Sequence, residues 1–358
     1  MSEIDSKTPV CVTGASGYIA GWIVRYLLEA GHAVHATVRD PSKTGSAAHL
    51  RKIADQAPGT LKLFQAELNV AGSFDEAVAG CGVVMHTASP FVLSGYRDAR
   101  SALLKPAVEG TRNVLGSVDR CPSVQRVVLT SSVAAIFGDN ADIGDTPEGV
   151  FTEAQWNTSS SLHHNPYQYS KAEAERTAWR ICEAQSRWDL VSINPAMVFG
   201  PSLTPASRSG SIDTLLQLGD GRLREGVPRL GMGVVDVRDV AQAHLLAAFT
   251  PSAEGRYILC AGTRTMLQMA NSLRGRFNGA YPFPRRELPK SLVWLFGPMK
   301  GPVTRRFVLR NVGVPPRLDN SRSKALGVRY RKVETTLAEH FEQAIKDGLL
   351  KPDGKRAA

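Results

Sequence analysis

The sequence predicts an α/β protein with a doubly wound parallel sheet and a smaller lobe interleaved with it. Three observations lead to this fold class. Short apolar runs alternate with longer helical patterns from residue 9 to about residue 200, which is typical of a parallel sheet covered by helices. A glycine-containing turn joins the first apolar run to the first helical pattern. The regular alternation ends after Gly200, where a region of different composition begins.

Six apolar runs are expected to form strands of the sheet: residues 10–12, 33–38, 61–66, 83–86, 126–129 and 190–193. Four helical patterns lie between them, at 19–30, 73–81, 99–119 and 166–186. In the third pattern, Leu103, Ala107 and Val114 belong to a stripe with a spacing of three or four residues. This spacing predicts a helix with one face toward the core.

The first glycine turn has the pattern of a dinucleotide-binding loop. Residues 10–19 read VCVTGASGYI, a strand followed by a turn and a helix start. Gly14 permits the tight turn, Gly17 lets the backbone approach a pyrophosphate, and the amides at the helix start attract anions. The third small position is Ala20, followed by Gly21, which changes only helix–sheet packing. We therefore expect a Rossmann fold whose loop contacts the cofactor through Gly14, Ala15, Ser16, Gly17, Tyr18 and Ile19.

The end of the second predicted strand indicates which dinucleotide binds. An acidic residue there would hold the ribose 2′-hydroxyl of NAD, but the sequence has Arg39. A planar guanidinium suits a 2′-phosphate, and Lys43 is placed to assist it. NADP(H) is therefore the predicted cofactor. Asp40 leaves NAD open, since a small backbone shift would bring its carboxylate to the ribose.

Further cofactor contacts are expected at the ends of the other strands. Glu67 and Leu68 follow the third strand, where an acidic side chain can accept from the adenine amine. Thr87, Ala88 and Ser89 follow the fourth strand, where small residues let the backbone run close to the cofactor. Thr130 places a hydroxyl at the end of the fifth strand. Ordinary turn chemistry is the alternative explanation for these residues.

The catalytic candidates lie on the fourth predicted helix. Asn165 suits the N-cap and Pro166 the first helical position. Tyr167 and Lys171 are four residues apart and therefore lie on the same face. A tyrosine with its ordinary pKa of about 10 is a poor proton donor at neutral pH. A nearby ammonium and an oxidised nicotinamide are expected to lower that pKa.

Two serines at the carboxyl end of the fifth strand complete the candidate site. Ser131 and Ser132 lie where ligands bind in open α/β sheets, so either hydroxyl could donate to a substrate carbonyl. The alternative, that they only satisfy backbone groups at a strand end, is more plausible for Ser131 than for Ser132.

Together these segments resemble the extended short-chain dehydrogenase/reductase family, in particular its branch of dihydroflavonol reductases and related aldehyde and ketone reductases. The matching stretches are VTGASGYI (12–19), ATVRDPSK (36–43), HTASP (86–90), RVVLTSS (126–132), YQYSKAEAE (167–175), NPAMVFGP (194–201), VVDVRDVAQAH (234–244) and GRYIL (255–259). A weaker match follows at 319–327. The resemblance implies that Ser132 is the catalytic serine, Tyr167 the proton donor and Lys171 its modulator. It also implies that Pro195 and Val198 lie against the nicotinamide.

Departures from the family pattern bear on the substrate. Dihydroflavonol reductases carry an asparagine five residues after the catalytic serine, and this chain has Phe137 there, which disfavours a polyhydroxylated flavonoid. The N-W-Y-C pattern of cinnamoyl-CoA reductases is absent, which disfavours a CoA thioester. Phe91, Phe137, Met197 and Leu203 suggest an apolar pocket for an aryl or alkyl ketone, although each could equally belong to the core.

We expect the remaining two-fifths of the chain to form the smaller lobe. Residues 202–233 are rich in Ser, Gly, Pro and Arg, with a short helix near 212–218. A strand at 234–237, a helix at 240–249, a strand at 256–259 and a last helix at 333–347 follow. We expect a flexible N-terminus at 1–8, an NAD(P)-binding Rossmann domain at 9–200, a substrate-binding lobe at 201–350 with segments that return to the first domain, and a flexible tail at 351–358.

Composition limits the possible environments and partners. The five cysteines of this 358-residue chain are far apart and lack metal-ligand spacing, so reduced thiols, no metal and a cytoplasmic location are expected. No signal segment or membrane span is evident. The net charge of +10 is mostly scattered, which indicates solvated surface rather than nucleic-acid binding. Residues 292–296 and the basic residues through Arg310 could contact lipid or line an apolar substrate cleft, and the cleft is favoured.

The sequence therefore predicts an NADPH-dependent carbonyl reductase with a small-molecule substrate, acting as a monomer or homodimer. An NAD-dependent 3β-hydroxysteroid-type dehydrogenase and a non-catalytic NADP-sensing Rossmann protein are the alternatives. A nucleotide-sugar epimerase is less favoured, because Arg39 opposes tightly held NAD.

Overall fold

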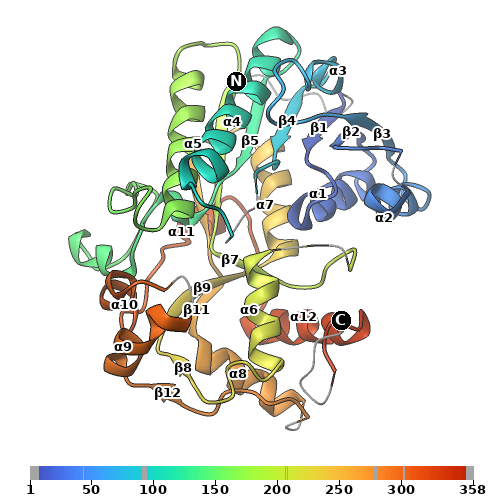
Figure 1. The fold of residues 1–358 in the computed structure, drawn as a ribbon. Coiled ribbons are helices and arrows are strands. Elements are labelled where there is room, and N and C mark those ends of the chain that lie inside the picture. The colour runs from blue at the N-terminus through green and yellow to red at the C-terminus, as the bar shows by residue number, and fades with distance from the viewer. Residues whose placement is uncertain are drawn as a thin grey trace.

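The computed structural model of the protein describes residues 8–42, 44–90, 95–205, 207, 209–277, 280–300 and 303–351. Its main feature is a seven-stranded sheet with the order β10-β6-β5-β4-β1-β2-β3, in which every neighbouring pair is parallel (Figure 1). The strands are β1 (Val10–Thr13), β2 (Ala33–Val38), β3 (Thr60–Gln65), β4 (Val83–His86), β5 (Arg126–Thr130), β6 (Asp189–Pro195) and β10 (Gly255–Leu259). The predicted fold class is confirmed.

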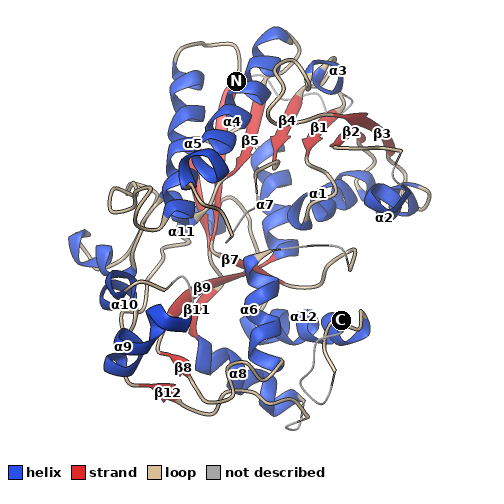
Figure 2. Ribbon diagram, in the orientation of Figure 1, coloured by secondary structure: helices blue, strands red, loops and turns tan. Residues whose placement is uncertain are grey.

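Helices cover both faces of this sheet (Figure 2). On one face α1 (Tyr18–Glu29) packs against α2 (Thr44–Ala54) and α7 (Val237–Phe249). On the other face α4 (Lys105–Arg120) packs against α3 (Asp75–Val78) and α5 (Pro166–Glu183). The strand order reverses between β1 and β4, and the crevice at such a switch point is where dinucleotides bind in this fold.

Two predicted helices differ from the observed ones for local reasons. The helix expected at 99–119 begins as a π-helical turn, η1 (Arg100–Leu104), before α4. Pro106 has no amide to donate to the preceding turn, so the regular hydrogen-bond pattern starts again around it. The helix expected at 73–81 shrinks to α3, because Gly80 has a φ of 74°, which ends a right-handed helix.

The lobe contains two small sheets. In the three-stranded sheet, β9 (Gly231–Asp236) pairs antiparallel with β11 (Gly262–Thr265) and parallel with β7 (Met197–Phe199). The other sheet pairs β8 (Val227–Pro228) with β12 (Glu287–Leu288). The helices are α6 (Gly210–Gly219), α8 (Met266–Arg276), α9 (Lys290–Lys300), α10 (Arg305–Asn311), α11 (Ser321–Ala325) and α12 (Val333–Lys346).

The lobe and the large sheet share part of the chain and part of the core. After β9 the chain returns to the large sheet through α7 and β10 before it re-enters the lobe (Figure 1). One buried cluster joins Ile23 of α1 and Val240 of α7 to Phe341 of α12. None of the helices in the described part of the chain is long and apolar enough to cross a membrane.

Candidate active site

The glycine loop between β1 and α1 is held by the second strand. The amide of Gly14 donates to Thr37 Oγ1 at 3.0 Å, and the amide of Ala15 donates to Thr37 O at 2.9 Å. Gly14 has a φ of 65°, and a Cβ at this position would lie 3.0 Å from the Cα of Ala88. Only glycine fits this backbone conformation and this close approach without strain.

The loop presents backbone rather than side chains to a ligand. The side chain of Ala15 is fully buried and its amide is already used. Tyr18 points into the core, where its hydroxyl donates to Gly200 O at 2.6 Å. No side chain caps α1, so the amides of its first turn remain available to an anion. The amide of Gly17 is also engaged, since it donates to Gly14 O at 2.9 Å. Of the expected loop contacts, Ser16 and the amide of Ile19 are therefore the ones open to a pyrophosphate.

A hydrogen-bonded turn after β4 forms the opposite wall of this crevice. Thr13 Oγ1 accepts from the amides of Thr87 at 3.1 Å and Ala88 at 3.0 Å. The Thr87 hydroxyl donates to Thr13 O. Thr13 Oγ1 is also 3.0 Å from Nδ1 of buried His86. Burial, with a smaller effect of Lys171, lowers the pKa of His86 to about 3, so this imidazole is neutral and anchors the turn.

The end of β2 favours Arg39 over Asp40 as the ribose contact. The Asp40 carboxylate accepts from the amide of Ser42 at 2.9 Å and from its hydroxyl at 2.6 Å, so a local turn engages it. Arg39 is exposed at the same edge. Lys43, expected to assist Arg39, lies outside the described residues.

Three other residues expected to contact the cofactor, Glu67, Leu68 and Thr130, make contacts within the protein. The amide of exposed Glu67 donates to Ser73 Oγ at 2.7 Å. Leu68 packs against Gly110, and Asn113 Nδ2 donates to Leu68 O at 2.6 Å. The Thr130 hydroxyl is 2.6 Å from His244 Nε2. The Glu67 carboxylate has no hydrogen-bond partner within the described ranges, whereas the Thr130 hydroxyl is engaged by His244.

Tyr167 and Lys171 lie on one face of the first turns of α5. Lys171 Nζ is 5.9 Å from the centre of the Tyr167 ring and donates to Ser89 Oγ at 2.9 Å. Burial raises the pKa of Tyr167 to about 12 and lowers the pKa of Lys171 to about 8, while Glu175 opposes the second shift. The sequence analysis expected a nearby ammonium and an oxidised nicotinamide to lower the pKa of Tyr167. Without that cofactor, burial raises this pKa instead. A protonated phenol beside an ammonium near its pKa suits proton donation.

Ser132 stands at the end of β5, beside α5. It caps the short helix η2 (Val133–Ala135), accepting from the amide of Ala134 at 3.1 Å, and η2 packs against α5. As a donor, its hydroxyl makes a long contact of 3.5 Å with Pro195 O, and Asn194 Nδ2 donates to its carbonyl at 3.1 Å. The hydroxyl is thus loosely held next to the start of β7.

Ser131, the neighbouring candidate, is engaged elsewhere. It is buried, and its hydroxyl donates to Glu175 Oε2. Glu175 also accepts from Asn194 Nδ2 at 2.7 Å and from Arg256 Nε at 2.7 Å. This difference favours Ser132 as the residue that can reach a substrate. The role of Glu175 was missed from the sequence, although it lies one turn beyond Lys171 on the same helix face.

The sequence predicted that the side chain of Asn165 caps α5, but it makes no capping hydrogen bond. It adopts the left-handed conformation, φ 54° and ψ 55°, unlike any other non-glycine residue in the described ranges. Its amide nitrogen instead donates to Gly138 O and to Asp139 Oδ1, both at 2.9 Å. The tertiary partners outcompete the local cap, and they fix the chain two residues before Tyr167.

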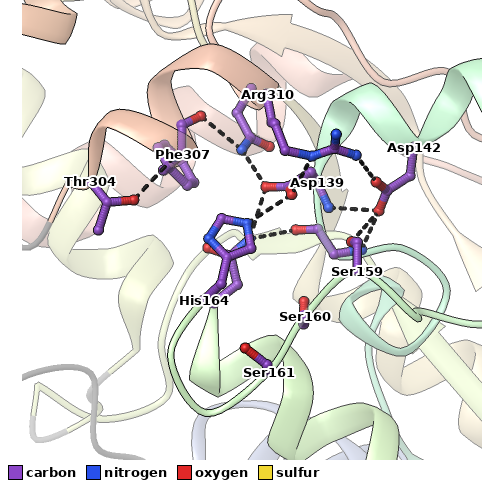
Figure 3. A network of polar contacts seen from close by, with 12 residues as sticks. Asp139, Asp142, Ser159, Ser160, Ser161, His164, Thr304, Phe307 and Arg310 are labelled. Atoms are coloured by element: carbon purple, nitrogen blue, oxygen red, sulfur yellow. Dashed lines mark hydrogen bonds and ion pairs between the residues drawn. The ribbon is translucent and has the colours of Figure 1, made fainter.

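Asp139 is the centre of a buried polar network that sequence analysis missed (Figure 3). Its carboxylate is fully buried and accepts from His164 Nε2 at 2.8 Å, Arg310 Nε at 2.8 Å and Asn311 Nδ2 at 2.7 Å, in addition to Asn165. Arg310 also reaches Asp142 Oδ1 at 2.5 Å. We call Asp139, Asp142, His164, Asn165, Arg310 and Asn311 the hinge network. It joins α10 of the lobe to the start of the helix that carries Tyr167.

The predicted apolar pocket residues pack against different clusters. Phe137 stacks on Phe151, with ring centres 4.1 Å apart, in a small cluster with Ile136. Met197 and Leu203 pack against the main core instead, and Leu203 lies close to Gly21 of α1. Phe91 lies outside the described residues. Val198 and Pro195, expected at the nicotinamide, are both buried near the end of β6.

Comparisons with known proteins agree with the fold. Residues 10–260 match the model of the NAD dependent epimerase/dehydratase family. Cinnamoyl-CoA reductase CAD2 of Medicago truncatula is 44% identical over 264 residues, which are 72% of this chain and 78% of the relative. Tetraketide alpha-pyrone reductase 1 of Arabidopsis thaliana is 34% identical and covers 96% of this chain and 98% of its own length.

Solved structures that superpose with this chain also include a reductase. Yeast methylglyoxal/isovaleraldehyde reductase Gre2, complexed with NADPH, superposes with a TM-score of 0.75. It is 28% identical and covers 94% of this chain and 98% of its own.

Proposed function

Because the chain belongs to the NAD dependent epimerase/dehydratase family, and within it to the dihydroflavonol-reductase-like branch of the extended short-chain dehydrogenases/reductases, we propose that it is an NADPH-dependent carbonyl reductase. It reduces an apolar or aryl aldehyde or ketone to an alcohol. The observation that carries this proposal is the position of Lys171, between Tyr167 and Ser89 at the crevice that the glycine loop borders. Named reductases among its relatives support the direction of the reaction.

The residues of this chain divide the chemistry between them. A bound reduced nicotinamide supplies the hydride to the carbonyl carbon. Ser132 donates a hydrogen bond to the carbonyl oxygen and orients it. The Tyr167 hydroxyl, protonated because its pKa is about 12, delivers its proton to that oxygen as negative charge develops there. The Lys171 ammonium then stabilises the phenolate that remains.

Arg39 selects NADPH in this proposal. Its exposed guanidinium lies at the end of β2, and the competing Asp40 is engaged by Ser42. The Arg39→Ala variant should lose most of its preference for NADPH over NADH, because a guanidinium–phosphate contact is a strong charge-assisted hydrogen bond. Steady-state rates with both cofactors measure the ratio. A wild-type enzyme that works only with NADH would reject the role of Arg39 and favour the 3β-hydroxysteroid-type alternative.

A cinnamoyl-CoA thioester is the second candidate substrate. The sequence lacks the expected thioester pattern, but a relative with 44% identity is named a cinnamoyl-CoA reductase. Oxidation of NADPH should therefore be followed with aryl ketones, aldehydes, β-keto esters, steroids and cinnamoyl-CoA in parallel. Turnover of the carbonyl compounds above that of the thioester supports the proposal. Binding of NADPH without turnover of any carbonyl would favour the non-catalytic alternative.

A further inference from the structure

The lobe presents an apolar surface that the proposed reductase chemistry does not use. Large hydrophobic side chains are exposed at six described positions, and five of these belong to α9 and α10: Leu292 (45%), Leu295 (47%), Phe296 (48%), Met299 (80%) and Leu309 (58%). The sixth, Val70 at 50%, lies far along the chain. We call these five side chains the α9–α10 surface. Contiguous exposed apolar residues of this kind mark interaction sites.

The order of residues along α9 makes this surface a continuous stripe. Leu292, Leu295, Phe296 and Met299 follow the i, i+3, i+4, i+7 spacing of one helix face. That spacing normally faces a protein core, but here the face is exposed. Another side of α9 already has a partner, since a Cβ at Gly297 would lie 3.6 Å from the side chain of Val303. The helix is therefore packed on one side and apolar toward solvent on the other.

The charges along this segment of the chain all have one sign. Residues 288–318 contain six Lys or Arg and no Asp or Glu. Lys290, Arg305 and Arg306 are exposed. Arg305 stacks over Trp294, 4.6 Å from its ring centre, and Lys290 Nζ donates to Leu309 O at 2.9 Å. These contacts hold the basic side chains of both helices at the stripe. The surface therefore suits a partner that is both apolar and anionic.

The α9–α10 surface is also firmly attached to the body of the protein. α9 packs on α10 (Figure 1), and α10 is anchored through Arg310 and Asn311 to Asp139 in the hinge network. Arg310 is thus turned inward, while Leu309 beside it is exposed. A rigid helix pair loses little conformational entropy on binding.

We propose that the α9–α10 surface docks the protein on an anionic lipid bilayer, with the apolar stripe inserted at the headgroup level. An interfacial amphipathic helix binds through its apolar area together with attraction between basic residues and acidic lipids. A second copy of the chain is a poorer partner, because a two-fold contact would bring the same basic residues face to face. The proposal concerns attachment only and leaves the catalytic site unchanged.

Vesicle flotation tests this proposal. The wild-type protein is incubated with phosphatidylcholine vesicles and with vesicles that contain phosphatidylserine as well. Binding to the anionic vesicles should exceed binding to the neutral ones by about tenfold or more, because Lys290, Arg305 and Arg306 are attracted to acidic headgroups. High salt should weaken the binding. Equal binding to both vesicles, or binding to neither, overturns the proposal.

Matched variants locate the binding to this surface. Leu295→Glu/Phe296→Glu and Arg305→Glu/Arg306→Glu should each abolish flotation. Val70→Glu, at an equally exposed hydrophobic position, and Lys324→Glu/Lys332→Glu, at two exposed lysines, should float like the wild type. Circular dichroism and the melting temperature show that each variant is folded. Loss of flotation in the controls as well, or its retention in the α9–α10 variants, overturns the proposal.

Two further outcomes would assign the surface to something else and also overturn the proposal. If Leu295→Glu/Phe296→Glu converts a wild-type dimer to a monomer in light scattering, with no flotation of either protein, the stripe is a contact between copies. If that variant raises the KM for an apolar ketone in the absence of vesicles, the stripe lines the substrate cleft. Failure of the proposed reductase function itself would appear separately, as absent turnover with intact flotation.

Discussion

Removal of the Asp139 carboxylate should damage both the fold and the active site. The side chain is fully buried and accepts from four side chains. In the Asp139→Ala variant the buried donors of His164 and Asn311 lose their acceptor, at about 1–3 kcal/mol each. Arg310 is 35% exposed and keeps Asp142, so its loss is smaller. We expect a total destabilisation of about 3–5 kcal/mol, within the range for broken buried pairs.

The same substitution should slow turnover more than it weakens cofactor binding. Asn165 loses one of its two anchors, and it holds the chain two residues before Tyr167. A misplaced phenol that loses about 1 kcal/mol of transition-state stabilisation lowers kcat about fivefold. The glycine loop does not contact this network, so the Kd of NADPH should change less than twofold.

Thermal unfolding and steady-state kinetics measure these two effects. At about 2–4 °C for each kcal/mol, the melting temperature should fall by about 6–20 °C. Asp145→Ala is the matched control, because Asp145 lies in the same short helix η3 (Asn140–Asp145) but is exposed. Equal stability and equal kcat in Asp139→Ala and Asp145→Ala would refute the hinge network as a support of the catalytic helix.

A pH profile and substitutions at three other positions test separate parts of the account. The wild-type reduction rate should fall above pH 8, where Lys171, with its pKa of about 8, loses its proton, while Tyr167 stays protonated. Glu175→Gln removes the negative charge that raises the pKa of Lys171, so the fall should move to lower pH, and an unmoved pH profile would contradict this. Asn165→Gly should retain more activity than Asn165→Ala, because glycine adopts the left-handed conformation without the cost of ~1–2 kcal/mol; equal kcat values would argue against a backbone role. Gly14→Ala should abolish NADPH binding in a fluorescence titration, since its Cβ would meet Ala88 at 3.0 Å; unchanged affinity would contradict the loop geometry.

The sequence was most informative where local patterns determine structure. Most strands of the parallel sheet are apolar runs because both faces are covered, while the edge strand β3 alternates apolar and polar residues. Each was predicted to within about two residues. The glycine loop was equally clear, because Gly14 is required by a local turn. Tyr167 and Lys171 needed only helical spacing. These features depend on residues close together in the chain.

The features that were missed depend on distant partners. Asn165 was expected to cap α5, but its conformation is set by Asp139, and Asp139 is in turn held by Arg310 from the lobe. The raised pKa of Tyr167 comes from burial, which no spacing predicts. In each case tertiary contacts override the local preference.

Tyr167→Phe tests the central claim most directly. Wild-type and variant protein are compared for NADPH binding by fluorescence and for NADPH oxidation with the best carbonyl substrate from the screen. The account predicts an unchanged Kd for NADPH, because only a hydroxyl is removed, and a loss of turnover of about 100-fold or more, the usual contribution of a positioned acid. Turnover within twofold of the wild type, with NADPH still bound, would contradict it.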